Sequence, residues 1–207
     1  MVKKIYLYPR WLRLWHTVNA LMFIILIVSG ISMQYASLEN PIIQFDIAVR
    51  LHNFGGVILT LSYSIFLVGN VFTSNGRYYK IVKQELGEPV KKQFRYYLSG
   101  IFKGELHPYP VTKDRKFNPL QKITYILVMY IGVPVMVITG WALLFPEIIV
   151  HNVFGTGGIF LTALFHVIAG FLLSVFMIIH IYFATIGHSV SSNFKAIVTG
   201  YHETEKE

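Results

Sequence analysis

The sequence of 207 residues contains no cysteine. This absence excludes disulfide bonds and iron–sulfur clusters held by cysteine thiolates. It also excludes the C-x-x-C-H motif that attaches a c-type haem covalently. Any redox cofactor must therefore be held non-covalently by other ligands. Histidine, which occurs eight times, is the obvious candidate.

Charged residues are scarce at 14% of the chain, whereas hydrophobic residues make up 54% and the mean hydropathy is +0.54. A soluble domain of this size cannot bury so much apolar surface in its own core. Four apolar runs are long enough to cross a bilayer, at about residues 12–35, 46–72, 119–145 and 158–187. We therefore expect an all-α integral membrane protein, a four-helix bundle formed by residues 1–207 as a single domain.

Basic residues are distributed unevenly between the connections. Four precede the first run and eleven lie from Arg77 to Lys122, but the connections "ASLENPIIQFD" and "PEIIVHNVFGTGG" contain none. Cytoplasmic loops carry the excess of Lys and Arg, so both termini and the polar connection 73–118 are predicted to be cytoplasmic. This asymmetry accounts for the net charge of +8 without nucleic-acid binding. We expect the connection to lie on the inner lipid surface. The first run is too long for a signal peptide, so we expect it to be an uncleaved helix.

Four histidines fall inside the predicted spans: His16, His52, His166 and His180. His166 and His180 are fourteen residues apart on one helix, which separates them by about 21 Å on nearly the same face. Because successive helices run in opposite directions, His16 and His180 share the inner depth, and His52 and His166 share the outer one. Two histidine pairs, one in each leaflet, predict two b-type haems with bis-histidine ligation between the helices of a bundle.

Residues near these histidines fit a flat cofactor. Gly56 and Gly170 lie one helical turn after His52 and His166, and alanine takes the same place after the other two histidines. Arg13 and Arg50 lie close enough in sequence to pair with haem propionates. Each feature has an ordinary alternative, which is small-residue packing between membrane helices for the glycines and interfacial snorkelling for the arginines.

Two other functions remain compatible with these patterns. One is a small histidine-dependent transporter or ion pathway, and the other is a membrane anchor whose histidines only pack helices. The transporter alternative lacks its usual parts, because the acidic residues closest to the spans, Asp46 and Glu147, lie near helix ends. A Soret band in purified protein separates haem binding from both alternatives.

The segments "YPRWLRLWHTVNALMFIILIVSG", "RLHNFGG" and "KFNPLQK", together with the last histidine pair, resemble one family over nearly the whole chain. It is the prokaryotic di-haem cytochrome b subunit of formate dehydrogenase, thiosulfate reductase and nickel–iron hydrogenase. The resemblance implies a multi-pass protein of a bacterial or archaeal cytoplasmic membrane. It implies an electron-transfer subunit that reacts with menaquinone or ubiquinone, rather than a stand-alone enzyme. Its implied partner is an iron–sulfur or cytochrome subunit, with a molybdenum-type or other catalytic subunit on the outer face.

In formate dehydrogenase-type members the quinone site lies near the inner haem, at a motif that Asn118 resembles here. A glycine of that motif is Leu120 in this chain, and the form "NPLQK" is nearer to the thiosulfate reductase branch. Asn118 is equally well suited to cap the helix that begins at Pro119. In the next turn, Gln121 is a candidate for shaping the quinone pocket or relaying protons, whereas Lys122 is expected on a solvated face.

Overall fold

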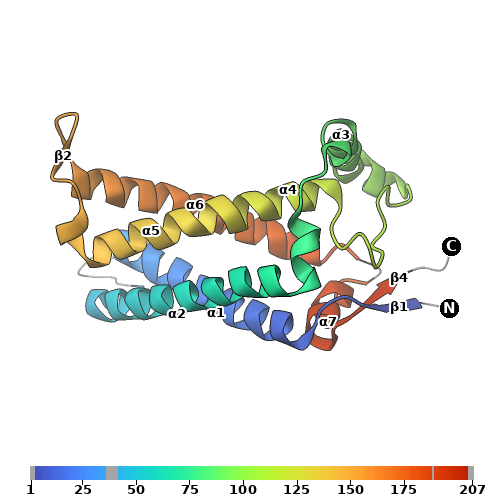
Figure 1. Cartoon of the computed structure of the whole chain (residues 1–207), viewed down its shortest axis with the longest axis horizontal. Helices are drawn as coiled ribbons and strands as arrows, with labels where there is room; N and C mark the ends of the chain where they lie inside the picture. The colour runs from blue at the N-terminus through green and yellow to red at the C-terminus, as the bar shows by residue number, and fades with distance from the viewer. Residues whose placement is uncertain (1–2, 36–41, 188, 205–207) are drawn as a thin grey trace. The chain divides into compact units, whose positions relative to one another are not determined.

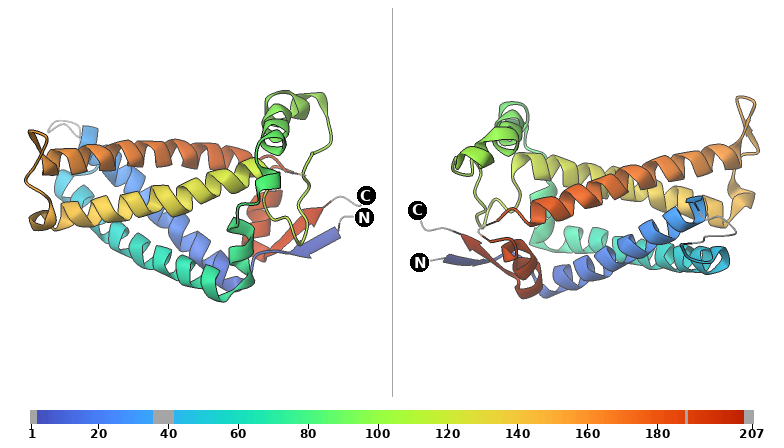
Figure 2. Two further views of the ribbon diagram at one scale, coloured as in Figure 1. Left: turned by 45° about the horizontal axis from the view of Figure 1, so that its top comes forward. Right: turned by 180° about the vertical axis from the view of Figure 1, so that it is seen from behind.

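The computed structural model describes residues 3–35, 42–187 and 189–204 of the chain. It contains four helices long and apolar enough to cross a membrane: α1 (Arg10–Tyr35), α2 (Phe45–Phe72), the span Pro119–Leu144 and α6 (Gly158–Ala184). Figures 1 and 2 show these helices from three directions. The predicted spans and the all-α membrane fold are confirmed, with helix ends within three residues of the predicted ones.

The third span is not one regular helix. It consists of α4 (Pro119–Leu127), a π-helical turn η5 (Val128–Gly132) and α5 (Val133–Leu144). Pro134 explains the interruption, because proline has no backbone N–H and its ring crowds the carbonyl one turn earlier. A π turn is one of the known ways for a helix to absorb such a defect.

The outward surfaces of the spans are apolar. On α6, for example, Phe165, Phe171 and Leu172 are all exposed by 60% or more. A soluble monomer rarely exposes so large a continuous apolar surface, but in a bilayer the same residues contact lipid chains. These four apolar helices make the chain a multi-pass membrane protein.

The connection between α2 and α4 is folded into short helices: η1 (Ser74–Tyr79), η2 (Lys83–Glu85), α3 (Glu88–Arg95), the π turn η3 (Tyr96–Gly100) and η4 (Ile101–Lys103). α3 packs against α4. The connection therefore has internal structure that the sequence did not predict, and its position on the inner lipid surface stays a prediction.

The two ends of the chain form an unpredicted sheet. β1 (Lys3–Tyr6) pairs with β4 (Tyr201–Thr204) in antiparallel register, directly after α7 (Ser192–Thr199). Gly200 joins α7 to β4 with φ of +91°, and its carbonyl accepts from the backbone N–H groups of Leu7 and Tyr8. A Cβ at Gly200 would lie 2.8 Å from the Tyr8 carbonyl oxygen, so glycine is required there. The pairing places the segment before α1 beside the segment after α7, as an even number of spans allows.

A small hairpin connects α5 to α6. After η6 (Pro146–Ile148), β2 (Asn152–Val153) pairs with β3 (Thr156–Gly157) through a turn in which Phe154 and Gly155 both have positive φ. This geometry is that of a type I′ hairpin turn. The Asn152 side chain accepts from the Gly155 N–H at 2.8 Å and closes the turn.

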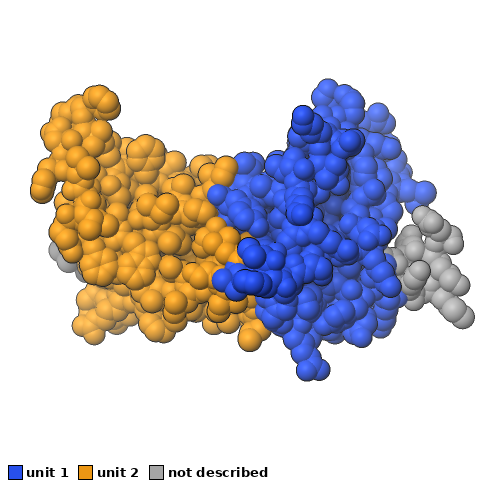
Figure 3. All heavy atoms as spheres, in the orientation of Figure 1, with its two compact units in different colours: residues 1–13, 68–130, 181–207 blue, residues 14–67, 131–180 orange. Residues whose placement is uncertain are grey.

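The chain divides into two compact units, coloured separately in Figure 3. Unit 1 comprises residues 1–13, 68–130 and 181–207, which include the terminal sheet and the folded connection. Unit 2 comprises residues 14–67 and 131–180, which include parts of all four long helices. All four histidines predicted as ligands belong to unit 2. Residues 36–41 of the first predicted outer connection lie outside the described residues.

Candidate functional site: two histidine pairs

Unit 2 brings His16 of α1 close to His180 of α6. Their ring centroids are 6.3 Å apart and the ring planes are inclined by 49°. The Phe176 ring stacks on His180 at 5.6 Å, and the Trp15 ring meets His16 edge-on at 6.4 Å. Aromatic rings therefore flank both imidazoles of this pair, which we call the inner pair.

His52 of α2 and His166 of α6 form the second pair, which we call the outer pair. Their centroids are 6.1 Å apart and the planes are inclined by 71°. α6 therefore contributes one histidine to each pair, and α1 and α2 contribute one each. The structure brings together the pairs that helix direction and depth predict.

The spacing within each pair fits a haem iron. Two imidazoles bound on opposite sides of one metal atom through bonds of roughly 2 Å have ring centres about 6 Å apart. Both measured separations match this value. The described residues hold no group of three or more His, Cys, Asp or Glu side chains that could bind a metal ion by themselves. The remaining equatorial ligands must come from the cofactor, as they do from a porphyrin.

Two hydroxyl groups contact the outer pair, and the sequence did not predict them. Ser29 Oγ lies 3.0 Å from His52 Nδ1, and Thr139 Oγ1 lies 2.7 Å from His166 Nδ1. Each hydroxyl also donates to a carbonyl of its own helix at 2.6 Å, to Ile25 for Ser29 and to Val135 for Thr139. The remaining ring nitrogen, Nε2, is the one that such an arrangement leaves for a metal.

A glycine follows each of these hydroxyl residues. A Cβ added to Gly30 would lie 3.4 Å from His52 Cε1, and one added to Gly140 would lie 3.3 Å from His166 Cε1. The helix backbones thus approach the imidazoles closely. The signal was present in the sequence as the dipeptides "SG" and "TG" inside two apolar spans, each opposite a histidine in another helix.

The predicted small residues leave room beside the outer ligands. A Cβ at Gly56 would meet no atom within 4 Å, and one at Gly170 would meet only the flexible end of Met136 at 3.5 Å. Ordinary helix packing would fill such positions with closer neighbours. The space fits a flat ring system lying against α2 and α6, and the haem-contact role of both glycines stays a prediction.

The two arginines predicted near propionates differ in their surroundings. Arg13 is half-buried in unit 1, and its guanidinium donates to the Val198 carbonyl near the end of α7. Arg50 is exposed on α2, two residues before His52. Both propionate contacts stay predictions.

Asn118 caps α4, which is one of the two roles predicted for it. Its Oδ1 accepts from the Gln121 N–H at 2.9 Å, while Gln121 Oε1 accepts from the Asn118 N–H at 3.3 Å, which completes a capping box. Asn118 is only 3% exposed, and its amide nitrogen donates to the Tyr97 hydroxyl at 2.8 Å. The Gln121 side chain is thus engaged with the cap.

Tyr97 links Asn118 to the C-terminal end of α6. Its ring lies 4.5 Å from that of Phe183, three residues beyond His180, and its edge faces His107. Burial raises the pKa of the Tyr97 phenol, and its interactions with Asn118 and Gln93 act in the opposite direction. The Tyr97 phenol is therefore protonated at neutral pH and able to donate a hydrogen bond.

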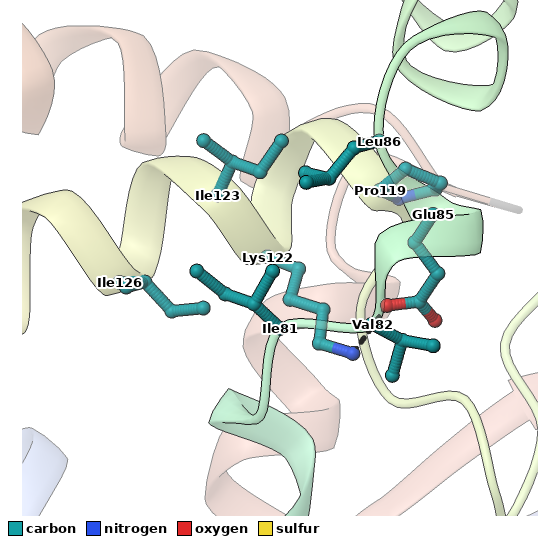
Figure 4. A pocket seen from close by; sticks show the side chains of 8 residues that line it. All are labelled: Ile81, Val82, Glu85, Leu86, Pro119, Lys122, Ile123 and Ile126. Atoms are coloured by element: carbon teal, nitrogen blue, oxygen red, sulfur yellow. Dashed lines mark hydrogen bonds and ion pairs between the residues drawn. The ribbon is translucent and has the colours of Figure 1, made fainter.

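The expectation that Lys122 faces solvent is wrong. Its side chain is 12% exposed and forms an ion pair with Glu85 of η2, which Figure 4 shows. Both residues line a cavity of about 10 Å³, together with apolar residues of the connection and of α4, and this cavity is too small for a quinone ring. A second cavity in unit 1, of about 640 Å³, lies beside β1 and η1, and Asn118 lines neither.

Comparisons with known proteins agree with this site. Residues 7–200 match the family model described as prokaryotic cytochrome b561. The chain is also 38% identical over 200 residues to "Putative cytochrome YdhU" of Escherichia coli (strain K12), a match that covers 97% of this chain and 75% of that protein. The family favours haem over the transporter and anchor alternatives.

Proposed function

Because the chain belongs to the prokaryotic cytochrome b561 family, we propose that it is the di-haem, quinone-reactive subunit of a respiratory oxidoreductase complex. Family membership makes it a b-type haem cytochrome of the membrane that carries electrons. The proposal adds the number of haems, the quinone and the partner subunit.

The observation that carries the proposal is the presence of two imidazole pairs at 6.3 and 6.1 Å in one unit. A bound haem supplies a one-electron couple between ferric and ferrous iron. His166 and His180, one from each pair, are fourteen residues apart on α6, or about 21 Å along the helix. Two sites so spaced cover most of a hydrocarbon core of about 30 Å, which suits electron transfer from one membrane surface to the other.

The quinone end of the pathway is proposed in unit 1, at Asn118 and Tyr97. Asn118 and Tyr97 form a buried donor pair, and Tyr97 packs on the segment of α6 that follows His180. The carbonyl oxygen of Asn118 is used by the cap, so its amide and the Tyr97 hydroxyl are the groups that would donate to the carbonyls of menaquinone or ubiquinone. Protons for quinone reduction would come from the cytoplasm, on the side where the basic residues place unit 1.

The partner is proposed at the opposite surface, beside the outer pair. An iron–sulfur or cytochrome subunit there would exchange electrons with the haem of His52 and His166, and a molybdenum-type or other catalytic subunit would carry the substrate site. Support comes from the sequence likeness to such subunits, nearest in "NPLQK" to the thiosulfate reductase branch.

Haem stoichiometry and ligand substitution test the two-haem proposal. We expect two six-coordinate low-spin haems per chain. His52→Ala and His166→Ala should remove or convert the same haem, and His16→Ala and His180→Ala the other, as followed by visible and EPR spectra. One haem per chain, or a shared spectral change in His16→Ala and His166→Ala, would contradict the assignment.

The quinone proposal is tested with the Asn118 side chain. Asn118→Asp keeps a good helix cap but removes the amide donor, so we expect slower haem reduction by quinol with unchanged spectra and dithionite reduction. Tyr97→Phe should act in the same direction. Gln121→Ala tests the other candidate of this turn: if Gln121 serves only the capping box, the variant should affect stability alone, and slower quinol kinetics would support its predicted role at the quinone site. Normal quinol kinetics in both Asn118→Asp and Tyr97→Phe would refute the site.

A further inference from the structure

We propose that Ser29 and Thr139 are positioning residues that fix both imidazoles of the outer pair as Nδ1–H tautomers and thereby lower the reduction potential of the haem held there. The inference rests on the proposed ligand role of His52 and His166. It concerns hydroxyl groups to which neither the sequence patterns nor the family description assigns a role.

The direction of each hydrogen bond follows from counting protons. A hydroxyl has one proton, and Ser29 and Thr139 each donate it to a backbone carbonyl at 2.6 Å. Toward the imidazole, each oxygen can then only accept. The facing Nδ1 atoms, at 3.0 and 2.7 Å, must therefore carry the hydrogen, and in a neutral imidazole the lone pair is then on Nε2.

The surroundings make these contacts rigid. Ser29 is fully buried, and each hydroxyl is anchored to its own helix by a carbonyl one turn earlier. Gly30 and Gly140, the next residue in each case, allow the helix to approach the imidazole at van der Waals distance. The hydroxyl and the glycine together restrict the position and rotation of each ring, and at His52 the Leu26 backbone is a further hydrogen-bond partner.

The four contributing helices are all different. Ser29 of α1 holds His52 of α2, and Thr139 of α5 holds His166 of α6. A hydroxyl group therefore contacts each of the two histidines that would hold this haem. An N–H that donates to an oxygen makes its imidazole a more electron-rich ligand, which stabilises ferric over ferrous iron. With both axial ligands affected alike, the two effects act in the same direction.

Redox titration of the haem-loaded protein tests the inference with Ser29→Ala, Thr139→Val and the double variant. Only the part of the hydrogen-bond energy that differs between ferric and ferrous haem shifts the potential, so each single change should shift the ferric-to-ferrous ratio of one haem by up to about tenfold at fixed potential. A tenfold change corresponds to about 59 mV for one electron. The potential should rise, the double variant should rise further, and the haem of the inner pair should not change.

Two controls separate this role from a general structural one. Thr139→Ser keeps the hydroxyl and should keep the wild-type potential. Ser32→Ala removes another fully buried hydroxyl of α1, which bonds the Ile43 backbone and not a histidine, and it too should leave the potential unchanged.

The outcomes are distinct. Unchanged potentials in Ser29→Ala and Thr139→Val, with two haems retained, would overturn the inference and leave the di-haem proposal intact. Fewer than two haems in the wild-type protein would instead overturn the proposed function. If Thr139→Val releases a haem, retention by Thr139→Ser supports the inference, and release by both overturns it.

Discussion

Lys116 is a buried lysine whose replacement by methionine should change how stability depends on pH. Its side chain belongs to the connection before α4, is 4% exposed, and donates to Asn75 Oδ1 at 3.0 Å. The rings of Tyr8, Tyr78 and Phe117 lie 4.6, 5.4 and 5.7 Å from its nitrogen. The described residues place no carboxylate at ion-pair distance from it.

Burial lowers the pKa of Lys116 from 10.5 to about 7. At about 1.4 kcal/mol for each tenfold change in the protonation equilibrium, this lowering corresponds to about 5 kcal/mol. Between pH 7 and 10.5 the unfolded lysine holds a proton that the folded one has released. Stability therefore rises with pH across this window, and the penalty is complete below pH 7.

Unfolding of the detergent-solubilised protein between pH 6 and pH 10 measures the effect. Lys116→Met should be more stable than the wild type by up to about 5 kcal/mol at pH 6, or about 10–20 °C in Tm for a chain of this length. The difference should shrink as the pH approaches 10. Comparing the variant with the wild type cancels the titration of all other groups.

Lys113→Met is the matched control, because Lys113 is an exposed lysine three residues earlier. Its unfolding curve should follow the wild type at every pH. If the stability difference between Lys116→Met and the wild type is the same at every pH from 6 to 10, burial does not deprotonate the amine and the reasoning is refuted.

Three further predictions concern the ion pair, the glycines and the topology. A double-mutant cycle with Lys122→Met and Glu85→Gln should give a coupling energy of about 1–2 kcal/mol, because the lysine is 12% exposed, and a value near zero would contradict a structural role. Gly140→Ala should alter the EPR spectrum of one haem without releasing it, since the new Cβ would lie 3.3 Å from His166, whereas an unaltered spectrum would place the imidazole elsewhere. In intact cells, a single cysteine at Phe154 should react with an impermeant thiol reagent and one at Lys92 should not. The reverse pattern would invert the topology.

The spans and the histidine pairs could be predicted because both follow from the bilayer. Its thickness sets the length of an apolar helix, and the alternation of helix direction sets the depth of His16, His52, His166 and His180. The π turn before Pro134 is a local event that shifts residues around the axis without changing the span's length. The length of a span and the membrane depth of a residue do not depend on such local details, whereas side-chain contacts do.

The contacts missed by sequence reasoning depend on partners distant in the chain. Lys122 was expected to face water because Glu85, thirty-seven residues earlier, gives no local sign of pairing with it. Ser29 and Thr139 looked like ordinary helix hydroxyls that bond their own backbone, which they also do. Only the approach of a second helix shows that the same oxygens accept from imidazoles.

The pairing of β1 with β4 has a consequence for synthesis in the cell. β1 leaves the ribosome well before its partner strand, which is made only after α6 and α7. Until then the β1 edge is unpaired, and the Gly200 carbonyl that binds Leu7 and Tyr8 does not yet exist. This sheet can therefore form only after α6 and α7 have been synthesised, and its formation joins the segment before α1 to the segment after α7.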